Sequence, residues 1–185
     1  MKKALLIASV LFIAVVSTAC INNIAVQELN NKAAEYMQKG DYDAAVNRLQ
    51  ASIDLDSTMY ETYYNLGIAA TSAKKYDIAI DAFENGMKIK SDYPNFYYSL
   101  AVAQSEYADT LVEDKVEEND ATKESKPATE EEKLQAIELK KSAVENLNKY
   151  LELSPQAEDR ETVETLIKDC NDFINGDTPK ESSAV

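Results

Sequence analysis

The sequence predicts an all-α fold, a short solenoid in which similar pairs of helices stack one on the next. The chain matches itself at an offset of 34 residues, so that positions 29, 63 and 97, for example, fall in register. A fixed period of this length is typical of stacked helix-pair repeats, each of which buries its apolar face against its neighbours. Only 4 glycines and 4 prolines interrupt the 185 residues, so the composition also favours helices. The positions in register include Leu29, Tyr63 and Tyr97, and also Ala33, Gly67 and Ala101.

The first repeat is predicted to span about residues 26–59 and the second about residues 60–93. In the first repeat, Lys39-Gly40-Asp41 is a turn signal that separates two helical segments. The second helix of this repeat is predicted from Tyr42 to Leu55, where apolar residues recur at helical spacing.

The second repeat carries the clearest motif, Tyr63-x-x-Leu66-Gly67 in its first helix and Ala79-x-x-x-Phe83 in its second. Gly67 and Ala79 are small, which suits two antiparallel helices that approach closely, whereas the larger side chains fill the space between units. This motif resembles the tetratricopeptide repeat (TPR). The resemblance implies two helices per repeat and a concave groove, lined by the first helix of each repeat, that binds another protein.

The third repeat is predicted to span about residues 94–157 and to be interrupted between its two helices. Ala143 and Leu147 reproduce the Ala-x-x-x-Phe step 64 residues after the second repeat, and 64 minus 34 leaves about 30 inserted residues. The insertion, about residues 108–133, contains ten acidic residues and four lysines. This composition is typical of a solvated loop. A site for Ca²⁺ or for a basic partner is the alternative.

A capping helix is predicted at about residues 159–175, because the end of a solenoid exposes an apolar face that must be covered. Cys170 lies in the apolar stripe of this helix, so we expect it to be buried as a small hydrophobic side chain. Residues 176–185 are polar and are predicted to form a disordered tail. The TPR-like domain is thus expected over residues 26–175.

Residues 1–19 have the anatomy of a secretory signal: a basic start, an apolar run from Ala4 to Val16, and small residues before Cys20. Small residues that end directly on a cysteine resemble the lipobox of bacterial lipoproteins. The resemblance implies a lipoprotein signal peptide, acylation of Cys20 and a short lipid-anchored tether over residues 20–25. It also implies a place in the bacterial cell envelope, either on the outer membrane facing the periplasm (Gram-negative) or on the outer face of the cell membrane (Gram-positive). An ordinary signal peptide with a chance cysteine at its end is the alternative.

The sequence lacks the residue types on which several kinds of chemistry depend. It has no histidine, which excludes Ser-His and Cys-His catalysis and imidazole metal ligands. It has no glycine-rich phosphate loop and no dinucleotide motif. We therefore predict no catalytic residues, no metal site, no cofactor and no enzymatic activity. The net charge of −14 repels phosphate, so nucleic acid is not expected as a partner.

The resemblance to tetratricopeptide repeats also implies a partner-binding groove along the first helices of the three repeats. This row is mostly uncharged and suits an extended segment or a partner helix. Family members that grip a terminal carboxylate use basic residues, which the row lacks. The two tyrosines of the row, Tyr64 and Tyr98, have two equal interpretations: they contact the partner, or they fill the space between neighbouring helices. The residues are Gln27, Asn30, Ala34 and Met37, then Glu61, Tyr64, Ile68 and Thr71, then Asn95, Tyr98, Val102 and Ser105.

These features predict a lipid-anchored TPR protein of the cell envelope that acts as a protein–protein interaction scaffold or assembly factor. Its partner is expected to be a protein or peptide near the membrane, because only about six residues separate Cys20 from the first repeat and span at most roughly 20 Å. Two alternatives stay open. One is a structural lipoprotein that self-associates into a homo-oligomer, and the other is an enzyme or carbohydrate-binding subunit that uses surface carboxylates.

Overall fold

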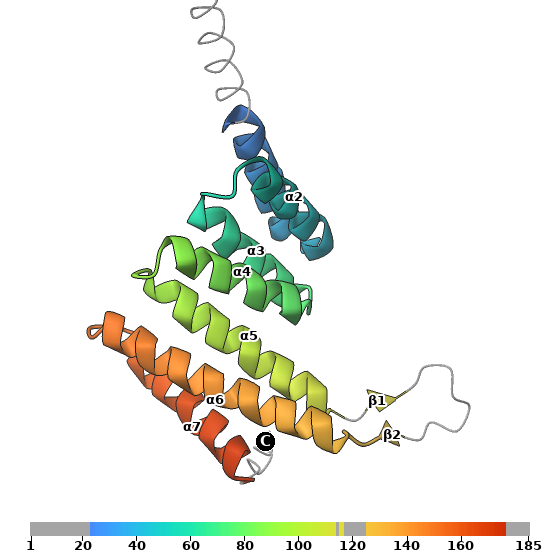
Figure 1. Ribbon diagram of the computed structural model, residues 1–185, viewed down its shortest axis with the longest axis vertical. Coiled ribbons are helices and arrows are strands. Elements are labelled where there is room, and N and C mark those ends of the chain that lie inside the picture. The colour runs from blue at the N-terminus through green and yellow to red at the C-terminus, as the bar shows by residue number, and fades with distance from the viewer. Residues whose placement is uncertain (1–22, 114, 117–124, 177–185) are drawn as a thin grey trace, which may run out of the picture.

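The computed structural model describes residues 23–113, 115–116 and 125–176. In these residues seven helices stack in chain order into an elongated solenoid (Figure 1), which confirms the predicted all-α fold. Two short strands, β1 and β2, form a minimal antiparallel ladder. The elements are a helix over residues 23–38, then α2 (Tyr42–Leu55), α3 (Tyr60–Ser72), α4 (Tyr76–Ile89), α5 (Pro94–Val112), β1 (Lys115–Val116), β2 (Ser125–Lys126), α6 (Glu130–Leu153) and α7 (Arg160–Asn175).

Several predictions concern residues outside the described part of the chain. The signal peptide (1–19), the lipidation site Cys20 and the tail beyond Gly176 lie there, and so does the centre of the insertion at 117–124. Among the described residues, no helix combines the length and the apolar character needed to cross a membrane.

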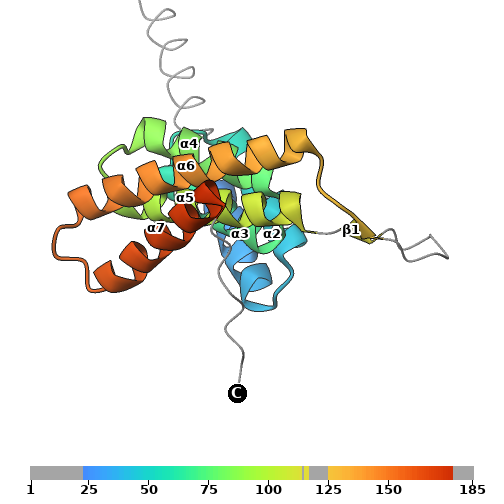
Figure 2. The ribbon, with the colours of Figure 1, turned by 90° about the horizontal axis from the view of Figure 1, so that it is seen from below.

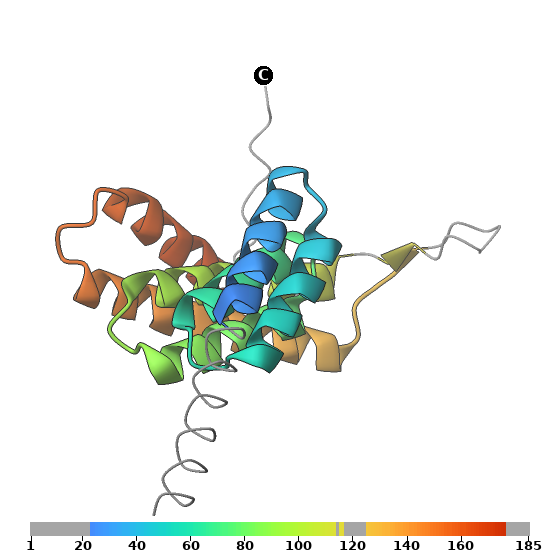
Figure 3. The ribbon, with the colours of Figure 1, turned by 90° about the horizontal axis from the view of Figure 1, so that it is seen from above.

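The helices form three antiparallel pairs, each helix packing against the next one along the chain. The first pair, the 23–38 helix and α2, lies at one end of the stack (Figure 3). The α3–α4 pair occupies the middle, and the long α5–α6 pair follows it. Helix α7 packs on α6 at the other end of the solenoid (Figure 2), where it covers the last pair.

Local sequence signals begin and end individual helices. Asp41 begins α2, because its side-chain Oδ1 accepts a hydrogen bond from the Ala44 backbone N–H at 3.1 Å. Thr129 and Glu132 begin α6 with a capping box, in which each side chain accepts a hydrogen bond from the other residue's backbone N–H. Gly176 follows α7 with a left-handed φ of 76°, a conformation that glycine adopts without strain.

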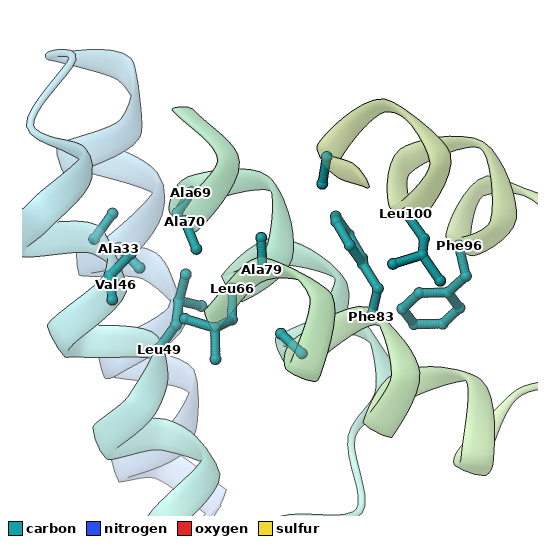
Figure 4. Packing of buried hydrophobic residues seen from close by; sticks show 13 residues of the cluster. Ala33, Val46, Leu49, Leu66, Ala69, Ala70, Ala79, Phe83, Phe96 and Leu100 are labelled. Atoms are coloured by element: carbon teal, nitrogen blue, oxygen red, sulfur yellow. The ribbon is translucent and has the colours of Figure 1, made fainter. Parts of the chain in front are cut away.

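A glycine and a phenylalanine meet at each of two successive helix interfaces. A Cβ placed on Gly67 would lie 2.3 Å from Cε1 of Phe83, so the α3–α4 approach requires glycine. This confirms the prediction that Gly67 is small because two helices come close there. Gly86 of α4 meets Phe96 of α5 in the same way, at 2.2 Å from Cζ to the added Cβ. The two rings lie side by side in the interior (Figure 4), with centroids 6.3 Å apart.

The interior consists of two clusters of buried apolar side chains rather than one central core. The larger cluster runs through the first two pairs into α5 and includes Leu49, Leu66 and Leu100 (Figure 4). The smaller joins α5, α6 and α7 and includes Leu147, Val163 and Cys170. Cys170 is fully buried, as predicted. Separate clusters between neighbouring helices are typical of a solenoid, in which each unit contacts only its neighbours.

The helices of the third pair extend into both edges of the predicted insertion. That insertion was placed at residues 108–133, but α5 remains helical through Val112 and α6 already begins at Glu130. The reason is burial, since Ala108 and Ala136 are both fully inaccessible between the two helices. Beyond these ends, β1 and β2 project away from the stacked helices (Figures 1 and 2).

Candidate functional site

The first helices of the three pairs form one side of the solenoid. Helix α3 contacts α5 directly, although α4 lies between them in the sequence. The 23–38 helix is joined to α3 by a hydrogen bond from Asn30 Nδ2 to Thr62 Oγ1 at 3.3 Å. These helices therefore lie side by side, and residues of the predicted groove occupy hollows at both of their junctions.

The hollow between α3 and α5 has a volume of about 150 Å³. It brings together four residues of the predicted row, Ile68, Thr71, Tyr98 and Val102, and adds Ser72 and Ser99. The volume is about that of an engineered cavity that holds a benzene molecule. Because most of its exposed wall is apolar, the hollow can accept one medium-sized apolar side chain.

The hollow between the 23–38 helix and α3 has a volume of about 300 Å³ and brings together three residues of the predicted row, Asn30, Ala34 and Met37. Gln38 and Asn65 add two further amides to its wall. Asn30 Oδ1 is buried and has no hydrogen-bond partner in the described part of the chain. Amide groups at this position can donate and accept hydrogen bonds, which is what a peptide backbone offers.

Tyr64 is half-buried at the junction of α3 and α5, where it packs against the larger cluster, and it lines neither hollow. Its ring centroid is 6.0 Å from that of Phe83 and 5.5 Å from that of Phe96. Its hydroxyl lies 3.3 Å from Ser99 Oγ, within hydrogen-bond distance. Tyr64 therefore occupies the space-filling position that the sequence analysis left as the alternative to ligand contact.

Tyr98 both lines a hollow of the predicted groove and fills space between neighbouring helices. It lines the hollow between α3 and α5, and its ring packs against Tyr150 of α6 with centroids 5.4 Å apart. The Tyr150 hydroxyl donates a hydrogen bond to Asp159 Oδ1 at 2.8 Å. Burial is the larger cause and the contact with the Asp159 carboxylate the second, and they raise the pKa of Tyr150 to about 12. The wall of the hollow at Tyr98 is thus supported by a neutral, anchored phenol.

Three other predicted residues, Gln27, Glu61 and Asn95, are exposed near the N-terminal ends of the three helices. None of them lines a hollow described above, so the structure does not bring them together with the others. Asn95 Nδ2 donates a hydrogen bond to the Tyr93 hydroxyl at 3.2 Å.

Ser105 was expected in the groove row and is instead buried beneath the cap. Its Oγ accepts a hydrogen bond from Lys140 Nζ at 2.8 Å and lies 3.7 Å from Cys170 Sγ. Lys140 also forms an ion pair with Asp109, with 2.7 Å between Nζ and Oδ1. The prediction for Ser105 is wrong because α7 packs over this part of α5 and ends the groove there.

Lys140 is not among the predicted residues, although the sequence carries a signal for it. The residue follows Ala136 by four positions and precedes Ala143 by three, so a lysine interrupts an apolar stripe at helical spacing. Burial raises the pKa of the nearby Cys170 thiol, while Ser105 and Lys140 act in the opposite direction. A buried thiol that stays protonated is chemically inert, so this cluster holds helices together and does not act as a nucleophile.

In the part of the chain that the structure describes, no group of three or more Cys, Asp or Glu side chains is arranged to hold a metal ion. The carboxylates of the described helices are distributed over the surface, and many pair with lysines along the same helix.

Two family models match the chain. The model described as TPR repeat matches residues 33–70, and the model described as tetratricopeptide repeat matches residues 60–93. Together the matches run through the first two helix pairs.

One curated relative is the tetratricopeptide repeat and J domain-containing co-chaperone DNJ1 of Cryptococcus neoformans var. grubii, which is 31% identical over 148 residues. The match covers 72% of this chain and 28% of the relative. The chain therefore spans little more than a quarter of the relative's length.

Solved structures of low sequence identity share the fold. The Arabidopsis OM64 TPR domain is 17% identical with a TM-score of 0.59, and the match covers 80% of this chain and 96% of that one. The first TPR of Spaghetti (RPAP3), bound to the HSP90 peptide SRMEEVD, is 15% identical with a TM-score of 0.58 over 81% and 93%. The Yersinia enterocolitica type III secretion chaperone SycD, in complex with a peptide of the translocator YopD, is 19% identical with a TM-score of 0.56 over 78% and 91%.

Proposed function

Because the chain is a tetratricopeptide-repeat protein, we propose that it is a protein–protein interaction scaffold whose groove binds an uncharged, extended segment of its partner. The observation that carries this proposal is the composition of the two groove hollows. Their walls contain no Lys, Arg, Asp or Glu, although the whole chain has a net charge of −14. Such hollows receive apolar and amide groups without desolvating a charge.

The two hollows suit different parts of the same segment. The hollow at Ile68 and Val102 receives an apolar side chain, which supplies most of the buried apolar area. The amides of Asn30, Gln38 and Asn65 hydrogen-bond to the backbone of the segment, which otherwise loses its contacts with water. This arrangement is the one expected for an extended peptide laid along neighbouring helices.

The proposed ligand differs from the one in the Spaghetti structure, whose HSP90 peptide SRMEEVD contains acidic residues. Binding of an acidic terminus needs a cation to compensate the buried carboxylates. The walls of the two hollows contain no cation. An apolar, uncharged segment is therefore the better match to this groove.

We also propose that acylated Cys20 anchors the protein in the bacterial cell envelope. The basic start, apolar run and small residues before Cys20 support this proposal. The first described helix includes residue 23, and three extended residues span at most about 11 Å. The anchor would therefore hold the groove close to the bilayer, so the partner would be a membrane-associated or near-membrane protein.

The anchor is tested by metabolic labelling with an alkyne analogue of palmitate in bacterial cells that express the full chain. We expect label on the wild type and none on Cys20→Ser, with Cys170→Ser labelled like the wild type because Cys170 is buried. Label that persists in Cys20→Ser, or that is absent from the wild type, would contradict lipidation at this residue.

The groove is tested by placing the photo-crosslinking residue benzoylphenylalanine in the full chain in cells. Met37 and Val102 report on the two hollows, and Asn47 on the exposed surface of α2 is the control. We expect the same partner to crosslink to positions 37 and 102 and not to position 47. Equal crosslinking from all three positions would contradict a groove-specific partner.

A further inference from the structure

A larger hollow lies between the second helices of the first two pairs, α2 and α4, with α3 beneath them. Its volume is about 480 Å³, compared with about 300 and 150 Å³ for the hollows of the groove. It uses Tyr63 and Leu66 of α3, which lie on a different face of that helix from Ile68 and Thr71. It is therefore a separate surface from the groove.

The inner wall of this hollow is apolar and its rim is acidic. Leu66 and Ala82 are buried, and Ile53, Tyr63 and Ile78 are partly buried. The rim carries the exposed carboxylates of Asp54 on α2 and Asp81 on α4, and the amides of Gln50 and Asn85. The inner wall of such a hollow can pack against the aliphatic stem of a long side chain. Its rim presents negative charge to the group at the end of that side chain.

The two carboxylates lack a positive partner in the described part of the chain. Asp43, also on α2, is paired with Lys75, whereas neither Asp54 nor Asp81 takes part in an ion pair there. The cation next to the rim, Lys88, donates its hydrogen bond to Asn85 Oδ1 at 2.9 Å. The two carboxylates of the rim are therefore unpaired among the described residues and lie over an apolar wall, and Lys88 is held at the Asn85 amide.

We propose that this hollow docks a basic segment of a partner protein, with an arginine side chain laid over the apolar wall and its guanidinium held by Asp54 and Asp81. Arginine buries its methylene stem while its charged end stays near water. The planar guanidinium of arginine donates hydrogen bonds to carboxylate and amide oxygens at the same time, and it stacks on aromatic rings such as that of Tyr63.

Charge also argues against a second copy of this chain as the occupant of the hollow. A second copy of this chain has 33 acidic and 19 basic residues, so its net charge is repelled by an acidic rim. The groove, by contrast, has uncharged walls. The two surfaces therefore select different chemistry, and one molecule can hold an uncharged segment on one side and a basic segment on the other.

The test uses the full chain in zwitterionic micelles with ¹³C-labelled isoleucine methyl groups. The probe is a capped alanine peptide that carries two arginines, and the control peptide has citrulline in place of arginine. We expect saturable shifts at Ile53 and Ile78, which line the hollow, and none at Ile68 in the groove. The citrulline peptide should cause no saturable shift.

The Asp54→Asn/Asp81→Asn double variant should bind the arginine peptide at least about tenfold more weakly. The matched control is Glu145→Gln/Glu158→Gln, which changes the net charge equally at two exposed residues away from the hollow. This control should bind like the wild type.

Equal weakening in both variants would show general attraction to an acidic protein and would overturn the proposal. Shifts at Ile68 alone, or no shift, would also overturn it. Shifts at Ile53 and Ile78 that depend on protein concentration without peptide would assign the hollow to a second copy instead. None of these outcomes affects the groove proposal, which crosslinking at Met37 and Val102 tests separately.

Discussion

Lys140 of α6 forms an ion pair with Asp109 of α5, with 2.7 Å between Nζ and Oδ1, and the two side chains differ sharply in exposure, at 7% and 52%. The same ammonium donates to Ser105 of α5 at 2.8 Å and lies 5.1 Å from the ring centroid of Phe173 in α7. One buried cation therefore joins three helices at the end of the solenoid where the groove stops.

The unequal exposure of the pair predicts unequal costs of removing its members. Asp109→Ala should lower the free energy of unfolding by about 2 kcal/mol, because it leaves the Lys140 ammonium buried without a counter-charge. Lys140→Met should cost less, because methionine keeps the apolar stem and Asp109 can be solvated. Urea denaturation of both variants measures the difference. A Lys140→Met variant that is the less stable of the two would contradict this account.

The contact between Gly67 and Phe83 predicts that a single methyl group is too large for the α3–α4 interface. Gly67→Ala should lower the free energy of unfolding by about 1–3 kcal/mol through overpacking, although alanine normally favours a helix over glycine by about 1 kcal/mol. Phe83→Leu should recover part of the loss when combined with Gly67→Ala, because the two changes share one space. Thermal and urea unfolding measure both effects. A Gly67→Ala variant as stable as the wild type would contradict the close approach.

The raised pKa of Tyr150 predicts a loss of stability in alkaline solution. Its pKa of about 12 exceeds the value of about 10 for an unfolded tyrosine. The stabilisation is therefore complete below about pH 10 and is lost as the pH rises from about 10 to about 12. Tyr150→Phe should be about 1–2 kcal/mol less stable than the wild type at neutral pH, and this gap should close near pH 12. A gap of constant size across that range would argue against the anchoring role of the Asp159 contact.

Burial of Cys170 predicts a thiol that reacts only when the protein opens. Burial raises its pKa and its side chain is fully covered, so both thiolate formation and access are reduced. In a Cys20→Ser chain, labelling with a thiol reagent should be at least about a hundredfold slower in the native state than in urea. Asp109→Ala should speed the native reaction by loosening the cap. Rapid native labelling would contradict the packing of α7.

Much of the fold follows from the 34-residue period because that period is set by contacts inside and between units. Gly67 was predicted to be small because two helices of one unit approach closely there, but the side chain that it meets was not predicted: Phe83 was expected to fill the space between units. Gly86 and Phe96 form the same kind of contact but were not predicted. Residue 52, which is 34 positions before Gly86, is serine, so the repeat pattern does not mark this position as glycine.

The groove was predicted only in part, because its residues were chosen from the register of one helix at a time. Ile68, Tyr98 and Val102 do share a hollow, since the period brings equivalent positions of α3 and α5 together. Tyr64 packs inward because aromatic rings from α4 and α5 surround it. Ser105 is covered because α7, which follows the insertion, returns over α5. Such a contact between distant segments is not encoded in a local pattern.

The affinity of the groove for the segment that crosslinks to Met37 and Val102 is the most direct test of the proposed binding site. Calorimetric titration of that segment should be done with the wild type, with Val102→Arg, and with Asn47→Arg, which adds the same charge to the exposed surface of α2. We expect Val102→Arg to bind at least about thirtyfold more weakly, because it places a charge in an uncharged hollow, and Asn47→Arg to bind like the wild type. Wild-type affinity in Val102→Arg would contradict the proposal that this groove is the binding site.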